Sequence, residues 1–241
     1  MSVMKIKKFV SIPEWAPVYT DLPHHFNGST GISILCRAPE GVIEKLMPEP
    51  LKAMGDQFIL RWQHMDECEG YRDIHFNEIL FPCKWRDKIG VHCAIEYIDN
   101  EMGLIIGREV WGFPKKWGDF TWRETWNGVH LECHKSGELL LRTEFTYFET
   151  PAIKWPVTSS YYLVKHIPPA SRTDTPLIKV VRIDLDKKTL HSSTTGTATI
   201  ELFNGQYDPL KQLGPVEVLG ARLDKVDSIV DYGEVVETIS T

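Results

Sequence analysis

The stretch DFTWRETWNGVHLECHKSGELLLRTEFTY, residues 119–147, decides the fold class. Its first run, residues 119–126, alternates large apolar side chains with polar ones. Asn127-Gly128 follows, and it predicts a hairpin turn because both residue types tolerate a positive φ angle. Ser136-Gly137 predicts a second turn, and the period of two resumes on both sides of it. The stretch therefore predicts three antiparallel strands in a meander.

Several other segments are short apolar or alternating runs of the kind that forms strands. They are residues 31–37, 91–97, 103–110, 178–185 and 197–203. One helix is predicted over residues 39–47, where apolar residues recur at helical spacing between Pro39 and Pro48. The fold class predicted from the residues is α+β, mostly antiparallel β, arranged as a barrel or sandwich with a few attached helices. No linker or repeat interrupts the chain, so residues 1–241 are expected to form a single domain.

Composition excludes several classes of function. The chain has 27 basic and 33 acidic residues and a formal net charge of -6, which argues against a nucleic-acid binder. No apolar run approaches the roughly 18 residues that cross a bilayer, so we expect no membrane partner. The first residues lack a long apolar stretch, and the five cysteines show no CxxC pair. We therefore expect a cytoplasmic protein with reduced thiols, and the histidine spacing predicts no metal site.

The candidate for chemistry is GREVWGFPKKWG, residues 107–118. Lys115 and Lys116 lie among aromatic residues, of which Trp111 and Trp117 are expected in the core. A lysine ammonium without water loses its proton more easily, and a neutral amine forms a Schiff base with a ketone. Successive strand residues point to opposite faces, so in an extended segment desolvation is the more reliable cause of activation. In a turn, repulsion between the two ammonium groups would add to it.

This stretch resembles the signature of the acetoacetate decarboxylase family, in which Gly-Arg-Glu is followed by an aromatic residue and Pro-Lys-Lys. The resemblance covers nearly the whole chain. Its other matching positions are Arg37 and residues 48–51, 97–101, 196–203, 208–210, 216–220 and 232–234.

The resemblance implies roles for individual residues. Lys115 would be the Schiff-base lysine and Lys116 the neighbour that perturbs its pKa. Arg37 resembles the active-site arginine, and Glu78 resembles the catalytic carboxylate. Asp73 is a rival match for that carboxylate.

Substrate-binding residues are also expected by resemblance. They are Phe113, Arg108 and Gln63. The family often has a second glutamate near Arg61-Trp62, and the matching residue here is Gln63. A neutral amide can hydrogen-bond but cannot carry charge or exchange a proton, which counts against decarboxylation.

The resemblance implies a cone-like β-barrel with flanking strands, assembled as a homo-oligomer, that needs no cofactor because the lysine supplies the electron sink. We expect a lyase that decarboxylates acetoacetate or a related β-oxo acid through an iminium on Lys115. One alternative is a pyruvate-type aldolase or dehydratase that uses the same lysine. A second alternative is a non-catalytic barrel that binds a small molecule.

Overall fold

Strands dominate the computed structural model, which describes residues 15–185 and 188–239. They are β1 (His24–Arg37), β2 (Lys52–Ala53), β3 (Gln57–Cys68), β4 (Tyr71–Trp85), β5 (Lys88–Ile98), β6 (Lys115–Trp117), β7 (Asp119–Thr125), β8 (Gly128–Lys135), β9 (Glu138–Tyr147), β10 (Ser160–Ile167), β11 (Leu177–Asp184), β12 (Lys188–Leu202), β13 (Asn204–Gly205), β14 (Asp208–Pro209), β15 (Glu217–Val230) and β16 (Glu234–Ile239). The helical segments are α1 (Val42–Leu46), α2 (Glu101–Ile106), the π-helix η1 (Gly107–Trp111) and the 3-10 helix η2 (Leu210–Leu213). The prediction of a mostly antiparallel β fold with few helices is confirmed.

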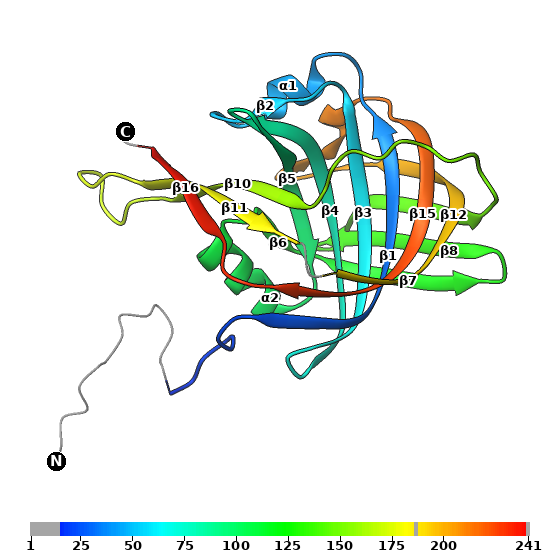
Figure 1. The fold of residues 1–241 in the computed structure, drawn as a ribbon, viewed down its shortest axis with the longest axis horizontal. Helices are drawn as coiled ribbons and strands as arrows, with labels where there is room; N and C mark the ends of the chain where they lie inside the picture. Colours follow the sequence, from blue (N-terminus) through cyan, green and yellow to red (C-terminus); the bar gives the residue numbers. More distant parts are fainter. Residues whose placement is uncertain (1–14, 186–187, 240–241) are drawn as a thin grey trace.

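One large sheet organises the described residues. Its strand order is β16-β11-β10-β5-β4-β3-β1-β15-β12-β9-β8-β7, with β2 paired to β4 and β6 paired to β5. Figure 1 shows the long central strands wrapping around the molecule, with α2 beneath β6 and α1 at the opposite end. The path begins at β16 and ends at β7, so the curved sheet is barrel-like without being closed.

The meander of residues 119–147 is present as β7, β8 and β9. Its second turn is the predicted one, with φ of 52° at Ser136 and 81° at Gly137. The first turn lies one residue earlier than predicted, because Thr125 pairs with Gly128 and leaves Trp126 and Asn127 as the loop. Gly128 already belongs to the strand, where a Cβ atom would lie 1.9 Å from the Phe145 carbonyl oxygen.

Residues 103–110 do not form the predicted strand, and this interpretation was wrong. They belong to α2 and η1. Asn100 accepts a hydrogen bond from the Gly103 backbone N–H and so caps the helix, and Met102 and Ile106 are buried four residues apart on one side. The predicted helix over 39–47 is present in shorter form as α1.

Each face of the sheet packs against a different part of the chain. On β1, Ile32 and Ile34 belong to a core shared with the meander and η2, which includes Leu131 and Leu213. Leu35 belongs to a second core that is covered by α2, η1 and β10. The alternation of the central strands therefore produces two apolar layers, and the candidate site lies on the side of the second.

Two further features concern the cysteines and the helices. The five cysteines are free and buried. Among the residues described, no helix has both the length and the apolar character needed to span a bilayer.

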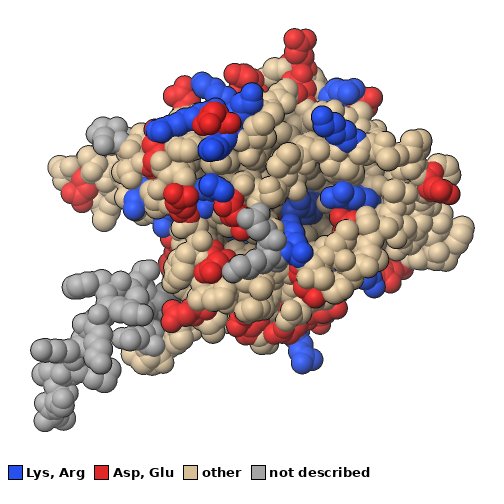
Figure 2. Space-filling view, viewed as in Figure 1, with Lys and Arg blue, Asp and Glu red and all other residues tan. Residues whose placement is uncertain are grey.

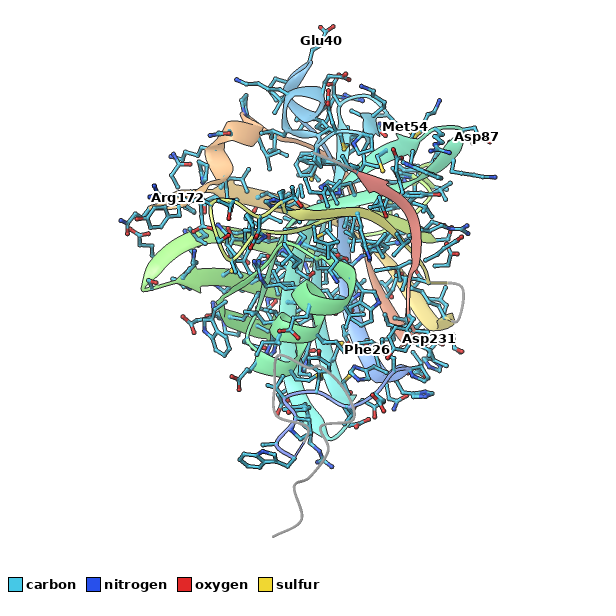
Figure 3. The ribbon with its side chains drawn as sticks, turned by 90° about the vertical axis from the view of Figure 1, so that its left-hand side faces the viewer. Phe26, Glu40, Met54, Asp87, Arg172 and Asp231 are labelled. Carbon is cyan, nitrogen blue, oxygen red and sulfur yellow. The ribbon has the colours of Figure 1, made fainter. Side chains whose placement is uncertain are left out.

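Seen from the side, Glu40 near α1 lies at one end of the molecule, while Phe26 and Asp231 lie together near the other (Figure 3).

His92 on β5 predicts a pH dependence of stability. Its ring is buried, its Nδ1–H donates to the Tyr162 carbonyl oxygen at 2.9 Å, and burial lowers its pKa to about 4. The unfolded chain takes up this proton near pH 6.5 and the folded chain does not, so stability is full above pH 6.5 and falls as pH drops toward 4. We expect a loss of roughly 3 kcal/mol across this range, measured by urea unfolding. In His92→Gln this part of the pH dependence should disappear, and an unchanged profile would contradict the assignment.

Candidate active site

Charged residues form a row across the concave face of the sheet. Strand register places Lys115 beside Glu96, Glu96 beside Glu78, and Glu78 beside Arg61. The row continues through Ser33 to Arg222. Directly paired residues project to the same side of a sheet. One line across the strands therefore brings one lysine–carboxylate pair and one arginine–carboxylate pair to the same surface.

A cavity of about 120 Å³ lies over this row. Its walls are mostly apolar and come from the sheet and from α2, with Phe76, Ile98, Met102, Ile106 and Phe113 among them. A dry cavity of this size accommodates a ligand of about the size of benzene. The space therefore suits a small metabolite that lies largely against apolar walls.

Lys115 is the primary amine in this cavity. Its side chain is 12% exposed, and its Nζ lies 3.0 Å from Glu96 Oε1. The ring centroids of Phe113 and Phe76 lie 5.4 and 5.8 Å from the same nitrogen. The amine is therefore enclosed by two aromatic faces and has one carboxylate as its charged neighbour.

Glu96 is 2% exposed. Burial raises the pKa of Glu96 above its usual range, Lys115 opposes this rise, and the nearby Glu78 carboxylate adds to it. A carboxyl group with a raised pKa can accept and return a proton near neutral pH. The pair of Lys115 and Glu96 therefore combines a nucleophile with a proton acceptor.

The second pair is locked by a tyrosine. Arg61 Nη1 donates to Glu78 Oε1 and to the Tyr161 hydroxyl, each at 2.9 Å, and the Tyr161 hydroxyl donates to Glu78 Oε1 at 3.0 Å. All three side chains are buried. Burial raises the pKa of Tyr161 well above its usual range, so the phenol keeps the proton that it donates. These three hydrogen bonds hold the Glu78 carboxylate, paired with the Arg61 guanidinium, in the floor of the cavity.

Lys116 points away from this cavity. Its Nζ donates to Asp208 Oδ1 at 2.6 Å, and Asp208 also accepts from Lys135 at 2.7 Å and from the Tyr97 hydroxyl at 2.8 Å. Lys115 and Lys116 pair with Glu96 and Tyr97, which are successive residues of β5 and face opposite sides. The segment is therefore extended, as in the first of the two cases considered from the sequence, and it does not bring the two ammonium groups together.

The turn before β6 sets the position of Lys115. The π-helix η1 ends at Gly112, whose φ of 86° favours glycine, and the Gly112 and Phe113 N–H groups both donate to the Gly107 carbonyl oxygen. Arg108 donates to the Lys115 carbonyl oxygen at 3.0 Å. Lys165 donates to the Glu109 and Val110 carbonyl oxygens. These contacts connect η1 to the start of β6 and to β10.

Gly107 is expected to be needed for the reactivity of Lys115. A Cβ atom at Gly107 would lie 2.5 Å from both Cδ and Cε of Lys115, while its φ of -57° suits any residue. Gly107→Ala should therefore displace the lysine side chain, leave stability within about 1 kcal/mol, and slow adduct formation roughly tenfold. Borohydride-trapping rates and urea unfolding measure both. Wild-type trapping rates in this variant would show that η1 does not confine the lysine.

The structure brings together some of the predicted site residues. Lys115, Glu78, Gln63 and Phe113 line the cavity. The rival Asp73 has an 84% exposed side chain 3.4 Å from His64.

Other predicted residues lie elsewhere. Arg37 pairs with Glu217 at 2.6 Å in an exposed position, and Arg108 contacts the Lys115 backbone without lining the cavity. Arg37 is four residues beyond Ser33 on β1, about 13 Å along the strand from the charged row. Trp111 is buried and also lines the cavity. Trp117 was predicted to lie in the core, but it is 46% exposed.

Three residues of the site were not assigned from the sequence, namely Arg61, Glu96 and Tyr161. Arg61 and Glu96 each interrupt an otherwise apolar stretch, FILRW and CAIEYI, and a charge in such a stretch is a usable signal. Tyr161 carries no such signal, because it comes to the site only through the parallel pairing of β10 with β5.

Glu78, Cys93 and Glu96 place potential metal-ligand atoms within 4.8 Å of one another. Arg61 already neutralises Glu78, and Lys115 already neutralises Glu96. A divalent cation there would have to displace or repel both cationic groups. The contacts therefore favour the organic cations as the partners of these carboxylates.

Comparison with known proteins identifies relatives across nearly the whole chain. The family profile described as acetoacetate decarboxylase (ADC) matches residues 12–240. An acetoacetate decarboxylase of Acidiphilium cryptum strain JF-5 is 25% identical over 231 residues, which cover 94% of each chain.

Two solved structures share the fold. A structure described as acetoacetate decarboxylase superposes with a TM-score of 0.86 at 20% identity and covers 97% of both chains. The enduracididine biosynthesis enzyme MppR, solved with the condensation product of pyruvate and imidazole 4-carboxaldehyde, gives a TM-score of 0.78 at 13% identity and covers 90% of both chains.

Proposed function

The chain belongs to the acetoacetate decarboxylase family, and on that premise we propose that it is a lyase that forms a Schiff base between Lys115 and a small β-oxo acid and releases carbon dioxide. The observation that supports this most is the position of the Lys115 amine, enclosed in a small apolar cavity 3.0 Å from Glu96. Acetoacetate or a close relative is the expected substrate.

The reaction begins with a proton transfer. Lys115 gives one proton to Glu96, which converts an ion pair into a neutral amine and a neutral acid. Burial favours this exchange because it disfavours the charged form of Glu96 and raises the pKa of that carboxyl group. The amine nitrogen then attacks the ketone carbon. The carbinolamine hydroxyl then takes the proton that Glu96 holds and leaves as water, and an iminium remains.

Carbon–carbon cleavage follows from the iminium. The bond to the carboxylate breaks, carbon dioxide leaves, and the electron pair moves to the iminium nitrogen to give an enamine. The enamine carbon takes up a proton, and water hydrolyses the resulting iminium to release a ketone and free Lys115. The apolar wall, including Phe76 and Phe113, favours loss of charge from the carboxylate.

Glu96 takes the proton-shuttle role that resemblance implied for Glu78. Glu96 contacts the reacting nitrogen, whereas Glu78 Oε1 accepts hydrogen bonds from Arg61 and Tyr161. Glu78 then acts as a fixed negative charge near Glu96, and Arg61 and Tyr161 are positioning residues that hold it.

A pyruvate-type aldol or dehydration reaction is the second candidate. It would use the same lysine to form an enamine of pyruvate. This enamine would then attack an aldehyde instead of taking up a proton. Gln63 supports it, since a neutral amide lines the cavity where the family often has a glutamate. MppR, whose fold this chain shares, is described with a condensation product of pyruvate and an aldehyde.

Borohydride trapping tests the proposal. Wild-type protein is incubated with acetoacetate or with pyruvate, reduced with borohydride, and measured by intact mass, while carbon dioxide is quantified in parallel. We expect a stable adduct with acetoacetate on Lys115 and release of carbon dioxide. An adduct without carbon dioxide would favour the aldol reaction. Absence of any adduct would reject Schiff-base chemistry and favour the non-catalytic barrel. The cytoplasmic location and the homo-oligomer stay predictions.

A further inference from the structure

A second cavity adjoins the one over Lys115. It has a volume of about 230 Å³ and lies over β3, β1, β15 and β12. Its lining includes Arg61, Lys188, Arg222 and Asp224, and only Gly31, Leu190 and Val226 of the lining residues lack a polar side chain. Its chemistry is therefore opposite to that of the largely apolar first cavity.

The two cavities share part of their walls. Arg61, Gln63, Lys188 and Val226 line both. The charged row that begins at Lys115 also ends in the second cavity, because Ser33 pairs with Arg61 on one side and with Arg222 on the other. A ligand bound to Lys115 can therefore extend along the sheet toward Arg222.

Among the described residues, the charges that line the second cavity leave one positive charge without a carboxylate partner. Arg61 pairs with Glu78 at 2.9 Å, and Arg222 Nε lies 3.0 Å from Asp224 Oδ2. Within the described ranges, no carboxylate oxygen lies within 4 Å of the Lys188 ammonium. One additional negative charge would therefore balance this cavity.

Hydrogen-bond donors are also available there. Arg222 Nε is buried, and its ion pair with Asp224 does not have hydrogen-bond geometry, so among the described residues this N–H has no acceptor. The Arg222 guanidinium lies 4.4 Å from the Trp155 ring centroid. Lys188 is an exposed residue at the edge of this cavity, but the protein packed around its ammonium lowers its pKa to about 8, and Arg61 and Arg222 add to this effect. A bound anion would relieve the repulsion among these cations. Figure 2 shows basic side chains gathered in and beside a hollow near the centre of the visible face.

We propose that the substrate carries a second carboxylate, at the end of its chain away from the ketone, and that Lys188 and Arg222 bind this group in the second cavity. This rests on the proposed function, because the ketone must react at Lys115. The carboxylate beside the ketone leaves as carbon dioxide in the apolar cavity, and the second carboxylate is retained in the product. The substrate class is therefore a β-oxo dicarboxylic acid.

Substrate pairs that differ only at the chain end test this. β-Oxo acids of six and of eight carbons are prepared with either a methyl or a carboxylate terminus, and kcat/KM for carbon dioxide release is measured for each. We expect the wild-type protein to prefer the carboxylate terminus by roughly tenfold or more at one of the two lengths, the size of a charge-assisted hydrogen bond. Lys188→Gln should lose most of this preference, because kcat/KM should fall much more for the carboxylate-ended acid than for the methyl-ended one.

Two further variants make the test specific. Arg222→Gln should lower the same preference. Lys225→Gln is the matched control, because Lys225 is exposed and follows Asp224 on β15, so its side chain points to the other face. It should keep the wild-type preference.

The outcomes separate this inference from the proposed function. Equal rates for both termini in the wild type would overturn the inference while leaving the lysine chemistry intact. An equal loss for both termini in Lys188→Gln would show that the cation binds the reacting carboxylate instead. If no acid forms an adduct, the proposed function fails. Calorimetry with unreactive eight-carbon mono- and dicarboxylic acids then tests whether the second cavity binds an additional carboxylate. Equal affinities for the monocarboxylic and the dicarboxylic acid would overturn the inference.

Discussion

Lys115→Met is expected to abolish borohydride-trapped adducts and to lower the rate of carbon dioxide release by at least about 10⁴-fold. The lysine is the amine that contacts Glu96 in the cavity, and methionine fills a similar space without a nucleophile. Because the electron sink of the reaction would be the lysine iminium, no residual route through the same intermediate exists. Intact mass and carbon dioxide release measure the two effects.

The variant also requires a stability control, since it leaves Glu96 without its cation. Burial favours the protonated form of Glu96, so the variant is expected to remain folded with a neutral acid in the cavity. Lys115→Met combined with Glu96→Gln should be similarly stable and equally inactive. Lys116→Gln should still form the adduct, because Lys116 contacts Asp208 on the other face. Loss of the adduct in Lys116→Gln would instead support the neighbour role implied by resemblance.

Arg61→Met is expected to lower the free energy of unfolding by about 3–5 kcal/mol. Arg61 and Glu78 are 7% and 3% exposed, and among the described residues the substitution leaves only the Tyr161 hydroxyl as a hydrogen-bond donor to the buried Glu78 carboxylate. The cost arises from the charge that remains, so adding Glu78→Gln should recover much of the loss. Urea unfolding at pH 7 measures both variants.

Arg37→Met provides the matched comparison. Arg37 and Glu217 form a pair at 2.6 Å, shorter than the 2.9 Å of Arg61 and Glu78, but their side chains are 48% and 60% exposed. Water already solvates both groups, so the loss should be below about 1 kcal/mol. Equal losses in Arg37→Met and Arg61→Met would contradict the view that burial, and not distance, determines the strength of the two pairs.

Much of the fold could be predicted from the sequence because it depends on local period. The alternation through residues 119–147 predicted β7, β8 and β9, and Ser136-Gly137 was identified as a turn because its positive φ angles need such residues. Residues 103–110 were mistaken for a strand because a short apolar run has no period that separates a strand from a buried helix. The cap at Asn100 was the missed signal.

The candidate lysine of the cavity could also be proposed from the sequence, because its aromatic and glycine neighbours are adjacent in the chain. The rest of the site depends on pairing between distant segments. Arg37 and Arg61 are both arginines on neighbouring strands, and only the register of β1, β3 and β4 places Arg61 beside Glu78. The same register leaves Arg37 at the exposed end of β1.

The sequence by itself determined that this is a strand-dominated chain with a lysine in an aromatic, glycine-shaped segment, since both properties are local. Only the tertiary structure decided which lysine faces the cavity, which arginine and carboxylates accompany it, and that a second, basic cavity adjoins it. The physical reason is that a strand places successive residues on opposite faces, so the face of Lys115 is fixed by its partner Glu96 on β5. That partner is chosen by hydrogen bonding between strands, which no local pattern of residues encodes.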